Sequence, residues 1–404
     1  MKSILLLTIL TLSSTFGFAQ KDEEKTLFDQ SWETPDDDLR RTYREKITEI
    51  ATTSQYGLYC SAWLKSINGR YNEALEVYNK LVRQHGKWGR SYYGRGDVKF
   101  QLRDMKGALT DLNKALQLEP ANKWVYLLRG SVKYEMLDFR GSITDFNEFL
   151  KFDPENPYGL YNRGLTHYDK GTIDSAYQDF TDAIESSPKF ALAYCSRGVI
   201  KADSGNLIAA IDDFAEAIKY DMKLEIAFYN LGIAQIKFGD PNNAIKSLTK
   251  AAELDTTWAN PYNDRAIAKR NAKDSTGALA DYNKAISLNP KFKDAFFNRG
   301  NLKKDLRDYY GAINDYNSVI FIDPKNAEAY ANRAVAKAES GDLNGAIADC
   351  DQALTIFPKF GIALYNRGFW KIQQNNKSNG CEDLKSASDN GITEAQDAMK
   401  ELCE

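Results

Sequence analysis

The tripeptide Asn298-Arg299-Gly300 has close copies 34 residues before it and 34 residues after it. In the same register, an arginine followed by glycine or alanine recurs at Arg95-Gly96, Arg129-Gly130, Arg163-Gly164, Arg197-Gly198, Arg265-Ala266, Arg299-Gly300, Arg333-Ala334 and Arg367-Gly368. Leu231-Gly232 stands in the one interior gap of this series. A strict period of this length predicts a chain of stacked units, each in contact with its neighbours, in place of a single globular core.

The residues of one unit indicate two helices. Residues 89–102 and 103–120 each carry apolar side chains at helical spacing. Gly96, Ala108 and Ala115 are small enough to let two helix backbones approach closely. A proline, which cannot continue a helix, follows the second half of six units, at Pro120, Pro154, Pro188, Pro290, Pro324 and Pro358. With Gln55 as the first residue, ten such units extend to residue 394.

This pattern resembles the tetratricopeptide repeat, a helix–turn–helix unit of the same length. The matching residues of one unit are Tyr92, Gly96, Ala108, Leu112, Ala115 and Pro120. The resemblance covers residues 55–394 and implies an all-α fold, a right-handed superhelical solenoid of helix–turn–helix repeats. The departures from the pattern are local: they are Met222, Thr256 and Ile392 for the proline, Phe149 for the last small residue, and Ala62 for the glycine.

The N-terminus differs in character from the repeats. Lys2 precedes an apolar run over residues 4–12, and the small residues Gly17 and Ala19 suit cleavage before Gln20. We therefore expect residues 1–19 to be a signal peptide, with a membrane anchor or a chance apolar start as the alternatives. Because the sequence resembles secretory leaders of Gram-negative envelope proteins, we expect export to the periplasm or cell envelope, or secretion. No other transmembrane segment is expected in the mature chain.

Residues 20–54 are expected to be an acidic leader followed by a capping helix. The stretch from Gln20 to Pro35 is acidic and polar, which predicts a mobile segment. A helix is predicted from Asp36 to Thr53, with one apolar face formed by Leu39, Tyr43, Ile47 and Ile50. We interpret it as a cap on the exposed face of the first unit, with a separate partner-binding helix as the alternative.

A second cap is predicted at the C-terminus, over residues 395–404, where Ala395, Met399 and Leu402 share one face. Cys381 and Cys403 lie in the last unit and this tail. If the chain is exported to an oxidising environment, these two cysteines are candidates for a disulfide.

The recurring arginine has a recurring partner. In eight of the ten units an aspartate follows it by 16 residues: Arg95/Asp111, Arg129/Asp145, Arg163/Asp179, Arg197/Asp213, Arg265/Asp281, Arg299/Asp315, Arg333/Asp349 and Arg367/Asp383. The remaining units have lost both members together, as Ser61/Val77 and Leu231/Ser247. Because paired loss indicates contact, we predict a structural ion pair within each unit, with a charged-ligand site as the less favoured interpretation.

The family resemblance also implies a ligand surface. In tetratricopeptide repeat proteins the first helices line a concave groove, and the fifth residue of each unit points into it. From Tyr93 onward this fifth site is aromatic in every second unit, at Tyr93, Tyr161, Tyr229, Phe297 and Tyr365. Asparagines follow one residue later, at Asn162, Asn230, Asn298, Asn332 and Asn366. The rings could grip an extended peptide and the amides could bond its backbone; the alternatives are ordinary packing and exposure to water.

The composition of the chain argues against several classes of function. The net charge is −3 and no basic stripe is present, which argues against nucleic acid as a partner. The two histidines show no metal-ligand spacing, no catalytic motif stands out, and the repeats leave no room for a catalytic domain, so we expect no enzyme activity, metal or cofactor. Some members of the family clamp chaperone C-termini with a lysine at the fifth site, but no unit has lysine there. We predict an exported scaffold or adaptor that binds a protein or extended peptide, with a glycan or cell-wall ligand as the alternative.

Overall fold

The computed structural model describes residues 22–34 and 36–404, and this part of the chain contains helices and no strand. The predicted signal peptide, residues 1–19, lies outside the described residues. The chain divides into two compact bodies, with the boundary in the sequence between Ala193 and Tyr194. None of the described helices is both long enough and apolar enough to cross a membrane.

The first body begins with a helix over residues 22–33. Its further helices are α2 (Asp37–Ile50), α3 (Gln55–Ile67), α4 (Tyr71–Gln84), α5 (Gly89–Gln101), α6 (Met105–Leu118), α7 (Lys123–Glu135), α8 (Phe139–Phe152), α9 (Pro157–Asp169) and α10 (Ile173–Ser186). The helix α11 (Ala191–Asp203) contains the boundary between the bodies.

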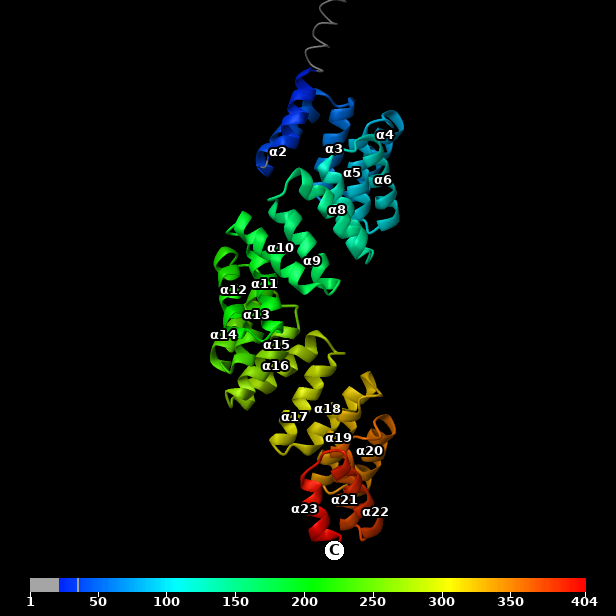
Figure 1. Ribbon diagram of the computed structural model, residues 1–404, viewed down its shortest axis with the longest axis vertical. Helices are drawn as coiled ribbons and strands as arrows, with labels where there is room; N and C mark the ends of the chain where they lie inside the picture. Colours follow the sequence, from blue (N-terminus) through cyan, green and yellow to red (C-terminus); the bar gives the residue numbers. More distant parts are fainter. Residues whose placement is uncertain (1–21, 35) are drawn as a thin grey trace, which may run out of the picture. The chain divides into compact units, whose positions relative to one another are not determined.

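The second body continues with helices of the same lengths. They are α12 (Leu207–Tyr220), α13 (Glu225–Phe238), α14 (Pro241–Leu254), α15 (Asn260–Asn271), α16 (Ser275–Leu288), α17 (Lys293–Asp305), α18 (Tyr309–Ile322), α19 (Ala327–Glu339), α20 (Leu343–Ile356), α21 (Gly361–Gln373), α22 (Lys377–Asp389) and α23 (Glu394–Leu402). Figure 1 shows α21, α22 and α23 together at the end of the chain.

Helices pair in the order that the period predicts. In the first body α5 packs against α6 and α9 against α10, and in the second α17 packs against α18. Within each body, the second helix of a unit also packs against the first helix of the next unit, for example α6 against α7 and α18 against α19. The predicted all-α solenoid of helix–turn–helix repeats is therefore confirmed.

Small residues let the two helices of a unit approach each other. A Cβ added to Gly164 of α9 would lie 2.7 Å from Cε1 of Phe180 in α10. A Cβ on Gly232 of α13 would lie 2.5 Å from Cγ of Leu248 in α14. Both distances are too short for a real carbon contact, so the packing of each unit depends on the missing side chain.

The turn between the two helices of a unit has a fixed form. Its left-handed residue is glycine in some units, such as Gly171 with φ +83°. In others it is a residue with a side chain, such as Leu137 with φ 62°. In the latter unit Asp138 then caps the second helix, and its side chain accepts a hydrogen bond of 2.9 Å from the backbone N–H of Gly141.

The prediction of a mobile acidic leader is wrong for residues 22–33, which form a packed helix. Phe28 is fully buried, with its ring centre 4.9 Å from that of Tyr56 and 5.5 Å from that of Trp88. Glu24 is also buried and accepts a hydrogen bond from the Ser54 hydroxyl. The acidic composition hid an apolar face that the first repeat covers.

The apolar face predicted for α2 is also partly wrong. The helix packs against α3, and Ile47 is fully buried, but Leu39 is 41% exposed. Arg44 is only 4% exposed, although nothing in the sequence pattern placed a charged residue in this interface. At the other end α23 packs against α22 and buries Ala395.

Candidate binding surface

The eight arginines each hold the aspartate that lies 16 residues later. In the unit of Arg299, Nε donates to Oδ2 of Asp315 at 2.9 Å and Nη2 donates to Oδ1 at 2.6 Å. The same two-pronged contact occurs in the other seven pairs, with Nη2–Oδ1 distances from 2.5 to 2.8 Å. Five of these seven pairs share the same distance of 2.6 Å: Arg95–Asp111, Arg129–Asp145, Arg265–Asp281, Arg333–Asp349 and Arg367–Asp383.

The depth of the aspartates corrects one part of the sequence interpretation. The spacing predicted the pairing, but it did not predict that the carboxylates are buried while the guanidinium groups stay partly exposed at the edge of the interface. A carboxylate enclosed between two helices cannot reach a ligand, so the charged-ligand alternative is wrong for the aspartate half of each pair. The buried members are Asp111, Asp145, Asp179, Asp213, Asp281, Asp315, Asp349 and Asp383, of which Asp383 is the most exposed at 7%.

A lysine one helical turn after the arginine contacts the same carboxylate. Lys303 Nζ lies 2.8 Å from Oδ2 of Asp315, and six other units repeat this contact. In the unit of Arg163, His167 occupies the lysine position, and its Nδ1 lies 2.8 Å from the Thr172 hydroxyl. A buried carboxylate with two cationic partners is the usual pattern, and Asp179 departs from it.

The arginines have a second partner residue that was not predicted from the sequence. Nη1 of Arg129 donates to the Asn113 side-chain oxygen at 2.7 Å, and Nη1 of Arg333 donates to that of Asn317 at 2.6 Å. Each partner lies 16 residues earlier, on the second helix of the preceding unit, so the arginine joins three helices. The signal was present in the repeats, because Ala215 stands at this position where Leu231 replaces the arginine. With its donors engaged in this way, the guanidinium is a structural group and not a ligand site.

The five fifth-site rings are all half-buried. In the first body the ring centre of Tyr93 lies 5.6 Å from that of Trp32, and Tyr161 lies 5.2 Å from Phe190. In the second body Phe297 packs 6.0 Å from Tyr316. Tyr365 packs against the core of the last two units. Each ring is therefore held by neighbours, and part of it remains accessible.

Tyr229 has both an aromatic and a polar contact. Its ring centre lies 4.5 Å from that of Trp258, and its hydroxyl donates to Oδ2 of Asp264 at 2.7 Å. Burial raises the pKa of the Tyr229 phenol, and the adjacent Asp264 carboxylate raises it further. Burial also raises the pKa of Asp264.

The five asparagines that follow the fifth sites differ in their hydrogen-bond partners. Asn230 Nδ2 lies 3.7 Å from Sγ of Cys195, and Asn298 Nδ2 donates to Oδ1 of Asn263 at 3.2 Å, so these two amides join consecutive units. The oxygen of Asn332 accepts from Lys304 Nζ at 3.4 Å. The side-chain amides of Asn162 and Asn366 have no hydrogen bond within the described part of the chain.

At the start of the solenoid, the fifth-site surface already holds a helix. Trp32, from the helix over residues 22–33, lies 6.1 Å from Tyr59 and 5.6 Å from Tyr93 between ring centres. Phe28 of the same helix meets the Tyr59 ring edge-on at 5.3 Å. Tyr59 and Tyr93 are the fifth residues of the first two units. The surface that the sequence singled out thus accepts the apolar face of an amphipathic helix.

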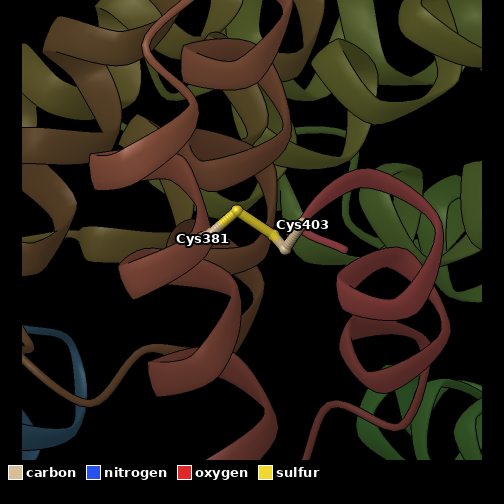
Figure 2. The surroundings of a disulfide bond; sticks show 2 residues. All are labelled: Cys381 and Cys403. Atoms are coloured by element: carbon tan, nitrogen blue, oxygen red, sulfur yellow. A yellow bond between two sulfur atoms is a disulfide. The ribbon is translucent and has the colours of Figure 1, made fainter.

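Cys381 of α22 and Cys403, which follows α23, form a disulfide with Cα atoms 5.9 Å apart (Figure 2). The bridge ties the capping helix to the last repeat. The free cysteines Cys60, Cys195 and Cys350 are buried. Burial raises the pKa of the Cys60 thiol to about 12 and that of Cys195 to about 11, so neither is a ready nucleophile. Among the described residues, no cluster of histidine, cysteine and acidic side chains could hold a metal ion.

Comparison with protein-family models matches the tetratricopeptide repeat over residues 65–123, 127–191, 226–257 and 297–359, which together make up more than half of the chain. The chain belongs to the tetratricopeptide repeat family. Proteins of this family are generally non-catalytic scaffolds, and their repeat domains bind proteins or peptides. The comparison with curated proteins gave no match.

Solved structures of the same family resemble this chain. The Cut9–Hcn1 hetero-tetramer of the APC/C is 14% identical with a TM-score of 0.50, over 95% of each chain, and this likeness shows the fold. A tetratricopeptide repeat protein from Parabacteroides merdae is 20% identical with a TM-score of 0.47, over 61% of this chain and 96% of that one. YrrB, described as a tetratricopeptide repeat protein with an unusual peptide-binding site, is 22% identical with a TM-score of 0.40, over 46% of this chain and 95% of that one.

Proposed function

We propose that this chain is an exported, non-enzymatic scaffold that binds a protein or extended peptide through the fifth-site surface of its first helices. The observation that carries the proposal is the docking of Phe28 and Trp32 on Tyr59 and Tyr93. An apolar helix face within the chain uses this surface in the first two units. Equivalent rings at Tyr161, Tyr229 and Phe297 are available to a segment from another molecule.

On this surface, aromatic rings and side-chain amides would contact the ligand. The half-buried rings are already held in place by their neighbours, so these rings would lose little conformational freedom when a ligand binds. The recurrent arginines are engaged within the fold, and no lysine stands at a fifth site. We therefore expect binding to depend weakly on salt.

Affinity capture from an envelope extract tests this proposal. Replacing Tyr161, Tyr229 and Phe297 together by leucine removes the rings and keeps apolar volume where they pack. We expect this triple variant to lose capture of a protein partner while its helical content is retained. A control variant replaces Tyr310 and Phe321 by alanine; these residues are 74% and 87% exposed and both lie on α18, the second helix of its unit. Unchanged capture by the triple variant would contradict the proposal, and capture of a polysaccharide in place of a protein would favour the glycan alternative.

Export is proposed on the basis of Lys2, the apolar run over residues 4–12, and Ala19. The Cys381–Cys403 disulfide suits an oxidising compartment. The mature chain should begin at Gln20. N-terminal sequencing of protein from the envelope fraction checks this, and a chain that keeps Met1 there would contradict it.

A further inference from the structure

The first body contains a small cavity beside the N-terminal helix, with a volume of about 150 Å³. Its walls come from the helix over residues 22–33 and from α2, α3, α5 and α7. The lining residues that define its chemistry are aromatic or charged: Trp32, Trp63, Tyr93, Trp124, Arg44 and Asp97.

Arg44 enters this cavity as a buried cation that forms no ion pair with a described residue. The side chain is 4% exposed, and its Nε donates to the Ser31 hydroxyl at 3.3 Å. Neither Nη atom has a hydrogen bond or an ion pair with any described residue. The buried carboxylate of Glu24 is engaged by Ser54 and not by Arg44. Burying a charge in this way is costly unless a partner neutralises it.

Other arginines of the chain show how unusual this is. Arg40, which also lines the cavity, pairs with Asp37 and donates to the carbonyl of Thr34 at 2.8 Å. The repeat arginines donate to two or three acceptor atoms each; Arg129, for example, donates to the side chains of Asp145 and Asn113. For Arg44 the nearest compensation is aromatic: its guanidinium carbon lies 4.3 Å from the centre of the Trp63 ring and 5.6 Å from that of Trp32. A cation–π contact orients the group but leaves its N–H donors unfilled.

A second donor close to the cavity also lacks an acceptor. The indole Nε1 of Trp32 is buried and has no hydrogen-bond acceptor. Trp32 therefore presents an apolar ring and a free N–H in the same neighbourhood as the Arg44 guanidinium. Donors of this kind call for an acceptor with more than one oxygen atom.

We propose that this cavity binds a small carboxylate with an apolar or aromatic body. The two carboxylate oxygens accept hydrogen bonds from Nη1 and Nη2 of Arg44, which is the arrangement that a planar guanidinium favours. The apolar body lies between the rings of Trp63, Tyr93 and Trp124. The site uses α2 and the N-terminal helix, which lie outside the repeats, and it does not depend on the proposed protein partner.

Asp97 is the opposing charge in the cavity. Burial raises the pKa of its carboxyl group, and a hydrogen bond from the Gln101 side chain partly offsets this. Replacing Asp97 by asparagine removes the repulsion and should strengthen carboxylate binding several-fold. A site built for an ammonium ligand would show the opposite response.

Tryptophan fluorescence provides a direct test, because three of the six tryptophans of the chain line the cavity. The full chain is titrated with benzoate, and with benzamide and benzylamine as neutral and cationic counterparts. We expect saturable quenching by benzoate and binding at least about tenfold weaker for the other two, because each lacks the charge-assisted pair with Arg44. Benzoate should also raise the unfolding temperature of the wild-type chain.

Two variants sharpen the test. Arg44→Gln should weaken benzoate binding by about tenfold or more. Arg41→Gln, on the same helix but outside the cavity lining and paired with Glu45, should change it less than about threefold. If Arg44→Gln does not fold, the wild-type ligand series and Asp97→Asn decide the matter. The proposal is overturned by an absence of saturable benzoate binding, by equal binding of benzamide, or by tighter binding of benzylamine. Benzoate binding that survives in a folded Arg44→Gln variant overturns it as well.

Discussion

Arg163 and Asp179 form a buried ion pair that no lysine supports. Nη2 of Arg163 lies 2.5 Å from Oδ1 of Asp179, and the aspartate is 4% exposed. His167 stands where the other Arg–Asp units have a lysine and bonds to Thr172. In the unit of Arg299, by contrast, Lys303 contacts the Asp315 carboxylate at 2.8 Å. The two units form a natural comparison of one cationic partner with two.

Removing the arginine should therefore cost more in the unit of Arg163 than in that of Arg299. Arg163→Met leaves the Asp179 carboxylate buried without a cation, which should reduce the free energy of unfolding by about 3–5 kcal/mol. Arg299→Met should cost less, because Lys303 still neutralises Asp315. Urea unfolding of the two variants measures the difference.

The double variant Arg163→Met/Asp179→Leu is the control for this prediction. Removing both charges should recover part of the loss, because no uncompensated carboxylate remains. Equal losses in Arg163→Met and Arg299→Met would show that the lysine contributes nothing to the pair.

His167 should make the stability of the chain sensitive to mild acid. Burial lowers the pKa of its imidazole below the usual 6.5, although the nearby Asp179 carboxylate opposes the shift. Because the folded pKa is depressed, the stabilisation is present above the unfolded pKa and is lost as the pH falls through the folded pKa. The urea concentration at the unfolding midpoint should decrease between about pH 7 and about pH 5, and this decrease should be larger for the wild type than for His167→Gln. Parallel behaviour of the two proteins would rule out this contribution.

The repeat period is what made the Arg–Asp pairs predictable from the sequence. Eight copies of one spacing, and the joint loss at Leu231 and Ser247, amount to an internal alignment. The second partner of the arginine leaves the same kind of signal in the sequence, at Asn113 and Ala215. It went unnoticed because it lies in the neighbouring unit. The burial of the aspartates could not be predicted, because a spacing does not show which helices cover the pair.

Segments that occur only once in the chain have no repeated copies to compare, so their contacts could not be predicted in this way. The helix over residues 22–33 has an acidic composition. Its buried Glu24 is bonded by Ser54, which lies 30 residues away in the sequence. The spacing of Glu24, Phe28 and Trp32 is helical, but the sequence cannot show which surface covers that face. The burial of Arg44 was hidden for the same reason. The half-buried state of the fifth-site rings depends on neighbours such as Trp32 and Trp258, which come from outside their own helices.

The turn residue Leu137 should be replaceable with a gain in stability. Its φ of 62° lies in the left-handed region, where a side chain costs about 1 kcal/mol relative to glycine. Leu137 is 74% exposed, so its removal loses little packing. Leu137→Gly should raise the free energy of unfolding by about 1 kcal/mol.

The matched control is the reverse change at the equivalent turn of the next unit. Gly171 has φ +83°, and Gly171→Leu should lower stability by a similar amount, with no clash because the space around it is open. Thermal unfolding of both variants checks the pair. A loss in Leu137→Gly would mean that the exposed leucine has a packing role.

The disulfide should stabilise the C-terminal cap. Cys381 and Cys403 are 22 residues apart, and closing a loop of this length contributes about 3 kcal/mol by the chain-entropy estimate. Reduction, or Cys381→Ser with Cys403→Ser, should therefore speed hydrogen exchange in α23. Cys350→Ala, at a buried free cysteine, should keep the sensitivity to reductant. Peptide mapping that finds both thiols free in the untreated protein would contradict the bridge.

Phe28 should hold the N-terminal helix on the first repeat. The ring is fully buried among Tyr56, Tyr59 and Trp88, and truncation of a buried phenylalanine costs about 3–5 kcal/mol. A loss of this size falls on one short helix, so Phe28→Ala should release that helix without unfolding the repeats. Hydrogen exchange over residues 22–33 should then approach that of an unprotected segment, while α5 and α6 keep their protection. Thr26→Ala, at an exposed position of the same helix, is the matched control and should leave exchange unchanged. Protection of residues 22–33 that survives Phe28→Ala would mean that Trp32 and the Glu24–Ser54 contact suffice to anchor the helix, and that the aromatic cluster does not determine how this surface grips an apolar face.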